Sequence, residues 1–166
     1  RYRTREQPSD PATWKPPRQR VCVPGDGVSL PEDGLFRSFM DGNVRYLLES
    51  FSVNELLYPF RKRAGRPDPP REREIDKVFP FWCADLLGSE TGRFLMGAAN
   101  TLKWLEHPEL RRRLEAIVDG VGECQSDDGY VYAFPPEGFL HSEQGNYARC
   151  WFTQGMIDAG AVYPRA

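Results

Sequence analysis

The sequence has no long hydrophobic run and no large excess of charge of either sign. Its 22 basic and 24 acidic side chains leave a formal net charge of -2 across 166 residues. Proteins that bind nucleic acid or an anionic membrane show a clear basic excess, so the composition argues against both partners. No apolar run reaches the roughly 20 residues that cross a bilayer, and we therefore expect no membrane span.

Histidine is scarce, and the common phosphate-binding and serine-nucleophile motifs are missing. The sequence contains no P-loop, no Gly-x-Gly-x-x-Gly and no Gly-x-Ser-x-Gly. Of the two histidines, His107 is interpreted as an exposed residue in a turn between helices. His141 lies in a polar loop, and no neighbouring motif favours a ligand there.

Cysteine occurs without any metal-binding or redox spacing. The four residues Cys22, Cys83, Cys124 and Cys150 are far apart in the sequence, and no Cys-x-x-Cys occurs. Neither a zinc finger nor a thioredoxin-like motif is therefore supported. Buried, inert thiols and a disulfide both remain open, because a disulfide needs a spatial proximity that the sequence does not show.

Proline is concentrated at one end of the chain. Eleven of the 15 prolines lie in the first 80 residues, and closely spaced prolines prevent a helix because each removes a backbone donor. Residues 1–34 are predicted to form an extended arm over the body, with short strands at most at Val21–Val23 and Val28–Leu30. Helical patterning begins after this arm.

Residues 35–63 show the period of helices. Apolar residues recur at three- and four-residue steps from Phe36 to Phe51, which places them on one helix face. A second, shorter helix is predicted over Val53–Phe60. The basic residues that follow it suit a helix C-terminus, and a charged, Pro-rich loop is predicted over 66–74.

The strongest helical patterns lie between residues 89 and 123. Ser89 is predicted to cap a helix with small residues on it, among them Gly92, which would let a neighbouring helix approach closely. Pro108 is predicted to begin the next helix, where its missing N–H costs nothing. The two helices predict an antiparallel hairpin. Arg111–Arg113 are expected on the solvated face.

The remaining segments predict a turn, a short strand and a last helix. Gln125–Tyr130 is predicted to form a turn around Asp-Gly, and Val131–Phe134 is predicted to form a short strand. The helix predicted over Asn146–Ala159 has apolar residues nearly all round, so it is expected to be buried on several sides. The chain is predicted to be all-α.

Carboxylates are abundant, so few of them stand out. Asp127 and Asp128 lie in a turn beside Tyr130, where Asp side chains commonly bond their own backbone. The alternative is a polar loop that presents carboxylate and phenol groups to a hydroxyl-rich ligand. Aromatic rings with a polar group suit either a sugar face or core packing; core packing is predicted for Trp104, and both uses stay open for Trp82 and Trp151.

Several motifs in a fixed order resemble one enzyme family. The resemblance covers roughly residues 21–162, and is carried by Gly34-Leu35-Phe36, Asn43-Val44-Arg45-Tyr46-Leu47-Leu48, Phe60-Arg61-Lys62-Arg63-Ala64-Gly65, Trp82, Leu87-Gly88-Ser89-Glu90-Thr91-Gly92, Glu123-Cys124-Gln125-Ser126-Asp127-Asp128-Gly129-Tyr130, Tyr147-Ala148-Arg149-Cys150-Trp151 and Gly155-Met156-Ile157-Asp158-Ala159-Gly160. The chain resembles the N-terminal part of the β-L-arabinofuranosidase-type glycoside hydrolases, family 127 and its relatives.

The resemblance implies an (α/α)6 barrel of helical hairpins, with residues 35–166 forming its N-terminal portion. It also implies hydrolysis, with retention, of β-L-arabinofuranosides or similar terminal sugars of plant polysaccharides. The family's nucleophile is a zinc-bound cysteine, its acid/base a glutamate, and the zinc is held by a Glu-x-Cys and a Cys-Cys pair. Neither motif occurs here. Glu123 directly precedes Cys124, with no residue between them, and no two cysteines are adjacent. We therefore expect no catalytic residue and no zinc in this chain, and we expect it to be a fragment or truncated product.

The residues predicted to contact sugar, by stacking or hydrogen bonding, are Trp82, Asp128, Tyr130 and Arg149. A histidine that the family uses to bind sugar has no match, since Arg149, Cys150 and Trp151 stand in its place. Two other classes remain open: a non-catalytic helical domain that binds carbohydrate or protein, and a different barrel enzyme such as a lyase or epimerase. The family's substrates favour a periplasmic or secreted location, and the oligomeric state stays unknown.

Overall fold

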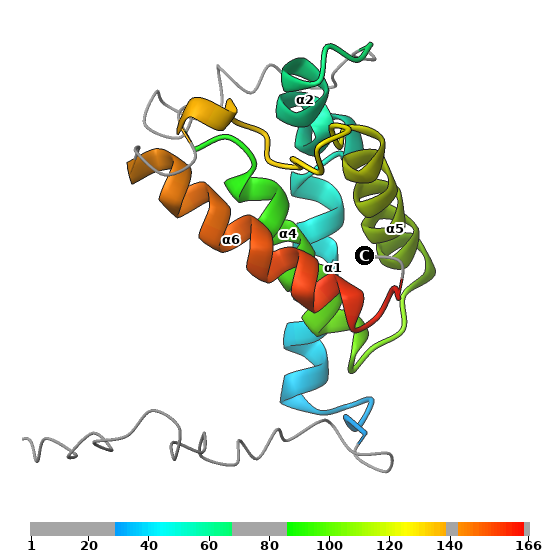
Figure 1. The fold of residues 1–166 in the computed structure, drawn as a ribbon. Coiled ribbons are helices and arrows are strands. Elements are labelled where there is room, and N and C mark those ends of the chain that lie inside the picture. The colour runs from blue at the N-terminus through cyan, green and yellow to red at the C-terminus, as the bar shows by residue number, and fades with distance from the viewer. Residues whose placement is uncertain (1–28, 68–85, 139–142, 165–166) are drawn as a thin grey trace, which may run out of the picture.

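The computed structural model describes residues 29–67, 86–138 and 143–164. Within these ranges the chain is all-α, as predicted, and contains no strand. Trp82, His141 and the predicted strand Val21–Val23 lie outside the described residues. The elements, in order, are α1 (Leu35–Ser50), α2 (Val53–Arg63), α4 (Ser89–Leu102), α5 (Pro108–Glu123), the short 3-10 helix η1 (Pro136–Gly138) and α6 (Glu143–Gly160) (Figure 1).

The first two helices begin where the sequence pattern predicts. Helix α1 starts at Leu35, and α2 starts after Ser52, whose hydroxyl accepts a hydrogen bond of 3.2 Å from the Glu55 amide. The Glu55 carboxylate accepts in return from the Ser52 amide at 3.3 Å, which completes a capping box. Helix α2 is longer than predicted, because its basic residues form the last turn rather than following it.

The start of α4 differs from the prediction. Gly88 is its N-cap with a left-handed φ of 87°, and Ser89 is its first helical residue. A Cβ atom on Gly88 would lie 3.1 Å from both Ala133 and Phe60, so glycine suits the position in space as well as in φ. The prediction that Ser89 caps the helix is therefore wrong. The Ser89 hydroxyl instead accepts from Arg93 at 3.2 Å.

The start of α5 agrees with the prediction for Pro108 and corrects the interpretation of His107. Pro108 begins the helix, and His107 is its N-cap, with the imidazole Nδ1 accepting from the Leu110 amide at 3.3 Å. His107 is half-buried, so its interpretation as an exposed turn residue is wrong, because its ring turns back to cap the helix. The connection from α4 is a five-residue segment, Lys103–His107, and within it Trp104 is 42% exposed. The prediction that Trp104 packs in the core is wrong, because α4 ends before it.

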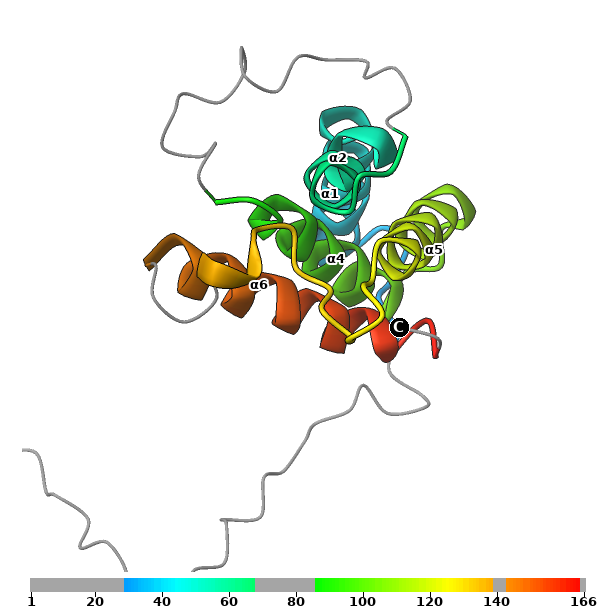
Figure 2. The same ribbon diagram turned by 45° about the horizontal axis from the view of Figure 1, so that its top comes forward.

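Helices α4 and α6 make the closest contact in the fold, and they lie side by side in both ribbon views (Figures 1 and 2). A Cβ atom on Gly155 would lie 2.7 Å from Gly92 Cα, and one on Gly92 would lie 2.6 Å from Phe152 Cα. The backbones therefore touch where two glycines meet. The expectation that small residues on α4 admit a neighbouring helix is confirmed at Gly92, and the neighbour is α6.

The core lies around α4, between α6 on one side and α1, α2 and α5 on the others (Figure 2). It includes fully buried side chains from α2, α4 and α5: Leu57, Phe60, Leu95, Leu110, Leu114, Ile117 and Val121. Helix α6 adds Phe152, whose ring centroid lies 5.1 Å from that of Phe60. The opposite face of α6 is open, with Ile157 63% exposed, so the predicted burial of α6 on several sides does not occur among the described residues.

The first half of α1 extends beyond the other helices (Figure 1). Phe36 and Phe39 are 74% and 66% exposed, while Val44 and Leu47 on the same helix are buried. The predicted stripe is therefore a core face over its second half only. In the described part of the chain, α4 reaches α1 at Asn43, whose side chain donates to the Thr101 hydroxyl at 2.7 Å.

Two of the three consecutive arginines on α5 serve as cross-links rather than as a solvated face. Arg113 donates bonds of 2.8 Å to the carbonyl oxygens of Leu48 and Phe51, at the end of α1. Arg111 donates at 2.9 Å to the Val162 carbonyl, beyond α6. Arg112 is exposed as predicted and pairs with Glu109. The exposed-face prediction is thus correct for Arg112 and wrong for the other two, whose long side chains reach neighbouring elements.

None of the described helices is long and apolar enough to cross a membrane.

Candidate functional site

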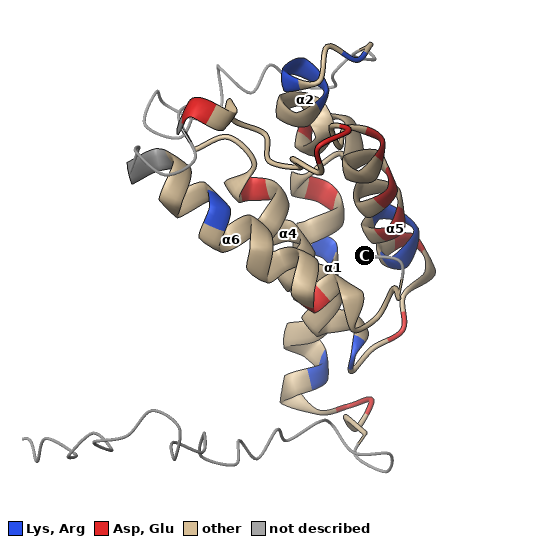
Figure 3. Ribbon diagram, viewed as in Figure 1, with Lys and Arg blue, Asp and Glu red and all other residues tan. Residues whose placement is uncertain are grey.

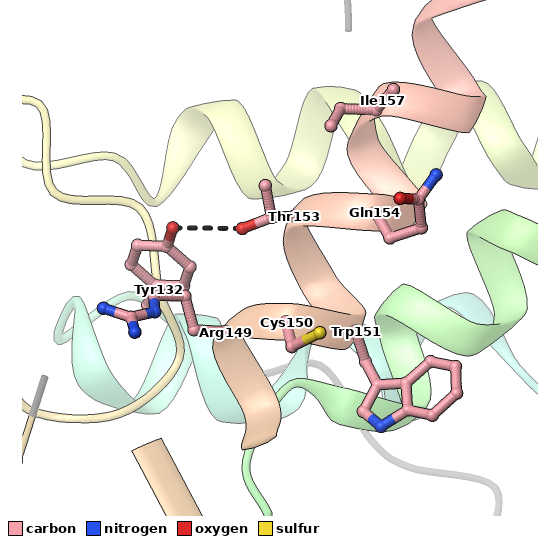
Figure 4. Close-up of a pocket in the computed structure, with 7 residues that line it drawn as sticks. All are labelled: Tyr132, Arg149, Cys150, Trp151, Thr153, Gln154 and Ile157. Carbon is pink, nitrogen blue, oxygen red and sulfur yellow. Dashed lines mark hydrogen bonds between the residues drawn. The ribbon is translucent and has the colours of Figure 1, made fainter. Parts of the chain in front are cut away.

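A groove runs along the open face of α6, and we refer to it as the α6 groove. It has a cavity volume of about 510 Å³ and is lined by Tyr132, Arg149, Cys150, Trp151, Thr153, Gln154 and Ile157. All but Tyr132 come from α6 itself (Figure 4). The charge map shows the described part of α6 as a mainly uncharged helix with one basic and one acidic segment (Figure 3), which the sequence identifies as Arg149 and Asp158. The groove therefore combines apolar surface with one cationic group.

Aromatic rings stand on opposite sides of Cys150 in the groove (Figure 4). Tyr132 packs against Phe152 with ring centroids 5.7 Å apart, and its hydroxyl lies 3.1 Å from that of Thr153. Trp151 points the other way, with the Arg93 guanidinium 5.9 Å from its ring centroid. Both rings are half-buried and held by neighbours, so they offer fixed apolar surfaces at the two sides of the groove.

The groove is also lined by side chains that form hydrogen bonds. Arg149 donates at 2.8 Å to the Asn146 side chain, which fixes the guanidinium beside the groove. Thr153 and Gln154 are exposed and contribute a hydroxyl and an amide. No Asp or Glu occurs among the described residues that line the groove. Such a lining suits binding of a polyhydroxylated molecule and offers no carboxylate pair for acid/base chemistry.

The turn before the groove shows a structural use of Asp128. The carboxylate accepts a 3.0 Å hydrogen bond from the Tyr130 amide, as expected for an Asp that bonds its own turn. Tyr130 donates its hydroxyl to the Phe134 carbonyl at 2.8 Å, and burial raises the pKa of its phenol. The prediction that Val131–Phe134 forms a short strand is wrong, because this segment is irregular. The carbonyl oxygens of Tyr132 and Phe134 accept from the side chains of Arg63 and Tyr130.

The structure brings two of the four predicted sugar contacts toward one place. Arg149 lines the α6 groove, and Tyr130 lies behind it, with its ring centroid 5.6 Å from that of Tyr132. Asp128 is exposed on the turn and lines no part of the groove, and Trp82 lies outside the described residues. Their roles in sugar binding stay predictions.

The four predicted sugar contacts do not include the other groove residues, although a sugar-stacking use was left open for Trp151. Tyr132 and Trp151 are conspicuous as aromatic residues near helix or loop ends, although the sequence alone does not separate them from core residues. Thr153, Gln154 and Ile157 follow Arg149 and Cys150 at helical spacing, so one face of α6 carries them all. This spacing could have indicated that these residues share one face. Because α6 has apolar residues nearly all round, that face did not stand out in the sequence.

The described residues do not fit a zinc site. No three side chains of the types His, Cys, Asp and Glu gather within the ranges that the structure describes. Cys124 is buried, burial raises the pKa of its thiol, and the thiol is free; Cys150 is free and exposed. The interpretation as a buried, inert thiol thus holds for Cys124 and is wrong for Cys150.

The all-helical fold, with a groove of aromatic and hydrogen-bonding side chains, fits the class of helical carbohydrate-active domains. Residues 28–165 match the family model described as beta-L-arabinofuranosidase, GH127 catalytic domain. The chain therefore belongs to this glycoside hydrolase family, and the resemblance found in the sequence is confirmed. No curated protein and no solved structure matches the chain.

Proposed function

We propose that this chain forms part of the sugar-binding surface of a glycoside hydrolase catalytic domain. The ligand is a β-L-arabinofuranoside or a similar terminal sugar of a plant polysaccharide. The observation that carries the proposal is the α6 groove, which lies within the matched residues and is lined by Arg149 and the Tyr132 ring on one side and by the Trp151 ring on the other. Rings can stack on the apolar face of a sugar while the guanidinium donates to its oxygens.

In this proposal the chain by itself binds sugar and does not cleave it. Retaining glycosidases place two reacting groups on either side of one bond, at about 5–5.5 Å from each other when both are carboxylates. The described lining of the groove provides no carboxylate. The 166 residues also contain neither the Glu-x-Cys nor the Cys-Cys motif to which the resemblance assigns the zinc-bound nucleophile.

We expect the purified 166-residue chain to release no p-nitrophenol from p-nitrophenyl β-L-arabinofuranoside, because it lacks these groups. The measurement is absorbance during a long incubation at high protein concentration, with and without added Zn²⁺. A chain with Cys150→Ser controls for slow reaction at the exposed thiol. Turnover above the rate of a heat-denatured sample would show that the chain holds a catalytic centre of its own.

Arg149→Ala is expected to weaken binding of an arabinofuranose oligosaccharide by about tenfold or more, because one charge-assisted hydrogen bond contributes about 1.5–3 kcal/mol. Chemical-shift titration of the ¹⁵N-labelled chain gives the dissociation constant and shows which amides respond. Arg112→Ala is the matched control, since Arg112 is exposed on α5 and pairs with Glu109. The proposal fails if the sugar shifts no amide of α6, or if both variants bind as the unchanged chain does.

A second candidate is a non-catalytic helical module that binds a protein or a carbohydrate chain. The observation in its favour is the exposed apolar surface of Leu35, Phe36 and Phe39 on α1, because exposed apolar clusters commonly mark contact surfaces. Phe36→Ser with Phe39→Ser would remove that surface and leave the groove intact. Sugar binding that survives this change assigns the groove, and not α1, to the sugar. The family match favours a hydrolase over a lyase or epimerase.

A further inference from the structure

Arg63, the last residue of α2, holds a loop more than 60 positions away in the sequence. Its Nε donates to the Tyr132 carbonyl at 3.0 Å, its Nη1 to the Ser126 hydroxyl at 2.7 Å and its Nη2 to the Cys124 carbonyl at 2.6 Å. The guanidinium carbon also lies 5.4 Å from the centroid of the Tyr130 ring. One side chain thus contacts the beginning, middle and end of the Cys124–Tyr132 segment.

The geometry suits arginine because its planar guanidinium directs several N–H groups along fixed, divergent lines. Each nitrogen of Arg63 has its own acceptor. Cys124 is the C-cap of α5, so its carbonyl also carries the partial negative charge of a helix end. Arg63 is half-buried, which reduces competition from water for these bonds.

The held loop leads directly into the α6 groove. The backbone carbonyl of Tyr132 accepts from Arg63, while its hydroxyl bonds with Thr153 and its ring packs on Phe152. Tyr132 is therefore fixed at its backbone by α2 and at its ring by α6. Among the residues that line the groove, Tyr132 is the one outside α6. The position of the loop therefore determines the position of this wall of the groove.

We infer that Arg63 is a positioning residue that fixes the Cys124–Tyr132 loop and thereby places Tyr132 on the wall of the α6 groove. The part of this inference that concerns sugar rests on the proposed function. The position of the loop does not, and it is measured separately.

Hydrogen exchange in Arg63→Gln tests the position of the loop. The Ser126 and Gly129 amides bond within the loop at 2.9 and 2.8 Å, and we expect their exchange to be at least tenfold faster while amides of α4 and α6 keep their rates. Arg61→Gln is the matched control. It removes the same charge from the same helix, and Arg61 bonds to Asn54 within α2. Unchanged loop exchange, or equal acceleration in Arg61→Gln, overturns the inference.

Arg63→Lys separates directed hydrogen bonds from charge. Lysine keeps the positive charge but carries its donors on one nitrogen, so we expect the loop amides to exchange nearly as fast as in Arg63→Gln. This variant decides the question if Arg63→Gln does not fold. Accelerated exchange across α4 and α6 as well would assign Arg63 to general stability, and full protection in Arg63→Lys would assign the effect to charge; either result overturns the positioning role.

Titration of the same variants with the arabinofuranose oligosaccharide tests the link to the groove. We expect about tenfold weaker binding in Arg63→Gln and Arg63→Lys, and none of this loss in Arg61→Gln. Loop release with unchanged sugar affinity would overturn the placement of Tyr132 as a ligand wall. If the unchanged chain binds no sugar while the loop is released in both Arg63 variants, the proposed function fails and the role of Arg63 in placing Tyr132 stands.

Discussion

Gly155→Ala is expected to lower the free energy of unfolding by about 3 kcal/mol or more, the upper part of the range for overpacked sites. The added methyl carbon would lie 2.7 Å from Gly92 Cα and within 2.9 Å of the Gly92 carbonyl carbon. These atoms are backbone of α4, so no side chain can move aside to make room. Relief requires α4 and α6 to separate, which opens the core around Phe152.

The matched control for this prediction is Gly122→Ala on α5. A Cβ there meets nothing within 4 Å, and alanine favours a helix over glycine by about 0.8–1.0 kcal/mol. We therefore expect the control to be neutral or slightly stabilising. Urea denaturation followed by circular dichroism gives both free energies. A loss below about 1 kcal/mol in Gly155→Ala would show that the two helices do not meet at these glycines.

Local sequence patterns were sufficient to predict the helices and the starts of α1, α2 and α5. The three- and four-residue spacing of apolar side chains gave α1, α4 and α5, and the fixed φ of Pro108 gave the start of α5. Small residues on α4 predicted a close neighbour. These features depend on interactions between residues that are close in the sequence, so they can be predicted from the sequence alone.

The pairing of the helices and the roles of the arginines were not predictable in this way. Gly92 indicates a close approach but does not name α6 as the partner, which comes from 50 or more residues later. Arg63 was expected to suit a helix C-terminus and Arg113 to lie on a solvated face, yet each donates to oxygens more than 60 positions away. Only the packed helices bring those carbonyls within reach.

The candidate site was predicted in part for the same reason. Tyr130 and Asp128 drew attention because they share a recognisable turn, and the structure shows that the turn itself uses the Asp128 carboxylate. Arg149 was found through the resemblance and lies in the groove. The place of Tyr132 in the groove was not predictable from the sequence, because it depends on Arg63 at the Tyr132 carbonyl and on Thr153 at the Tyr132 hydroxyl.

Phe60→Ala is expected to cost about 3–5 kcal/mol of the free energy of unfolding, as large core deletions do. Phe60 is 0% exposed, its ring lies 5.1 Å from that of Phe152, and it packs under Gly88 at the start of α4. Removing the ring leaves a cavity where α2, α4 and α6 meet. Since both Phe152 and the Gly88 turn close over this ring, little of the cavity can collapse.

Phe36→Ala tests whether this cost comes from burial rather than from the loss of an aromatic ring. Phe36 is 74% exposed on α1, and surface substitutions usually change the free energy of unfolding by no more than about 0.5 kcal/mol. Both variants are compared by urea denaturation at one pH, and the expected difference between them exceeds about 2.5 kcal/mol. Similar costs for the two would mean that Phe36 is covered in solution or that Phe60 is not, and either result contradicts the packing described for α1 and α2.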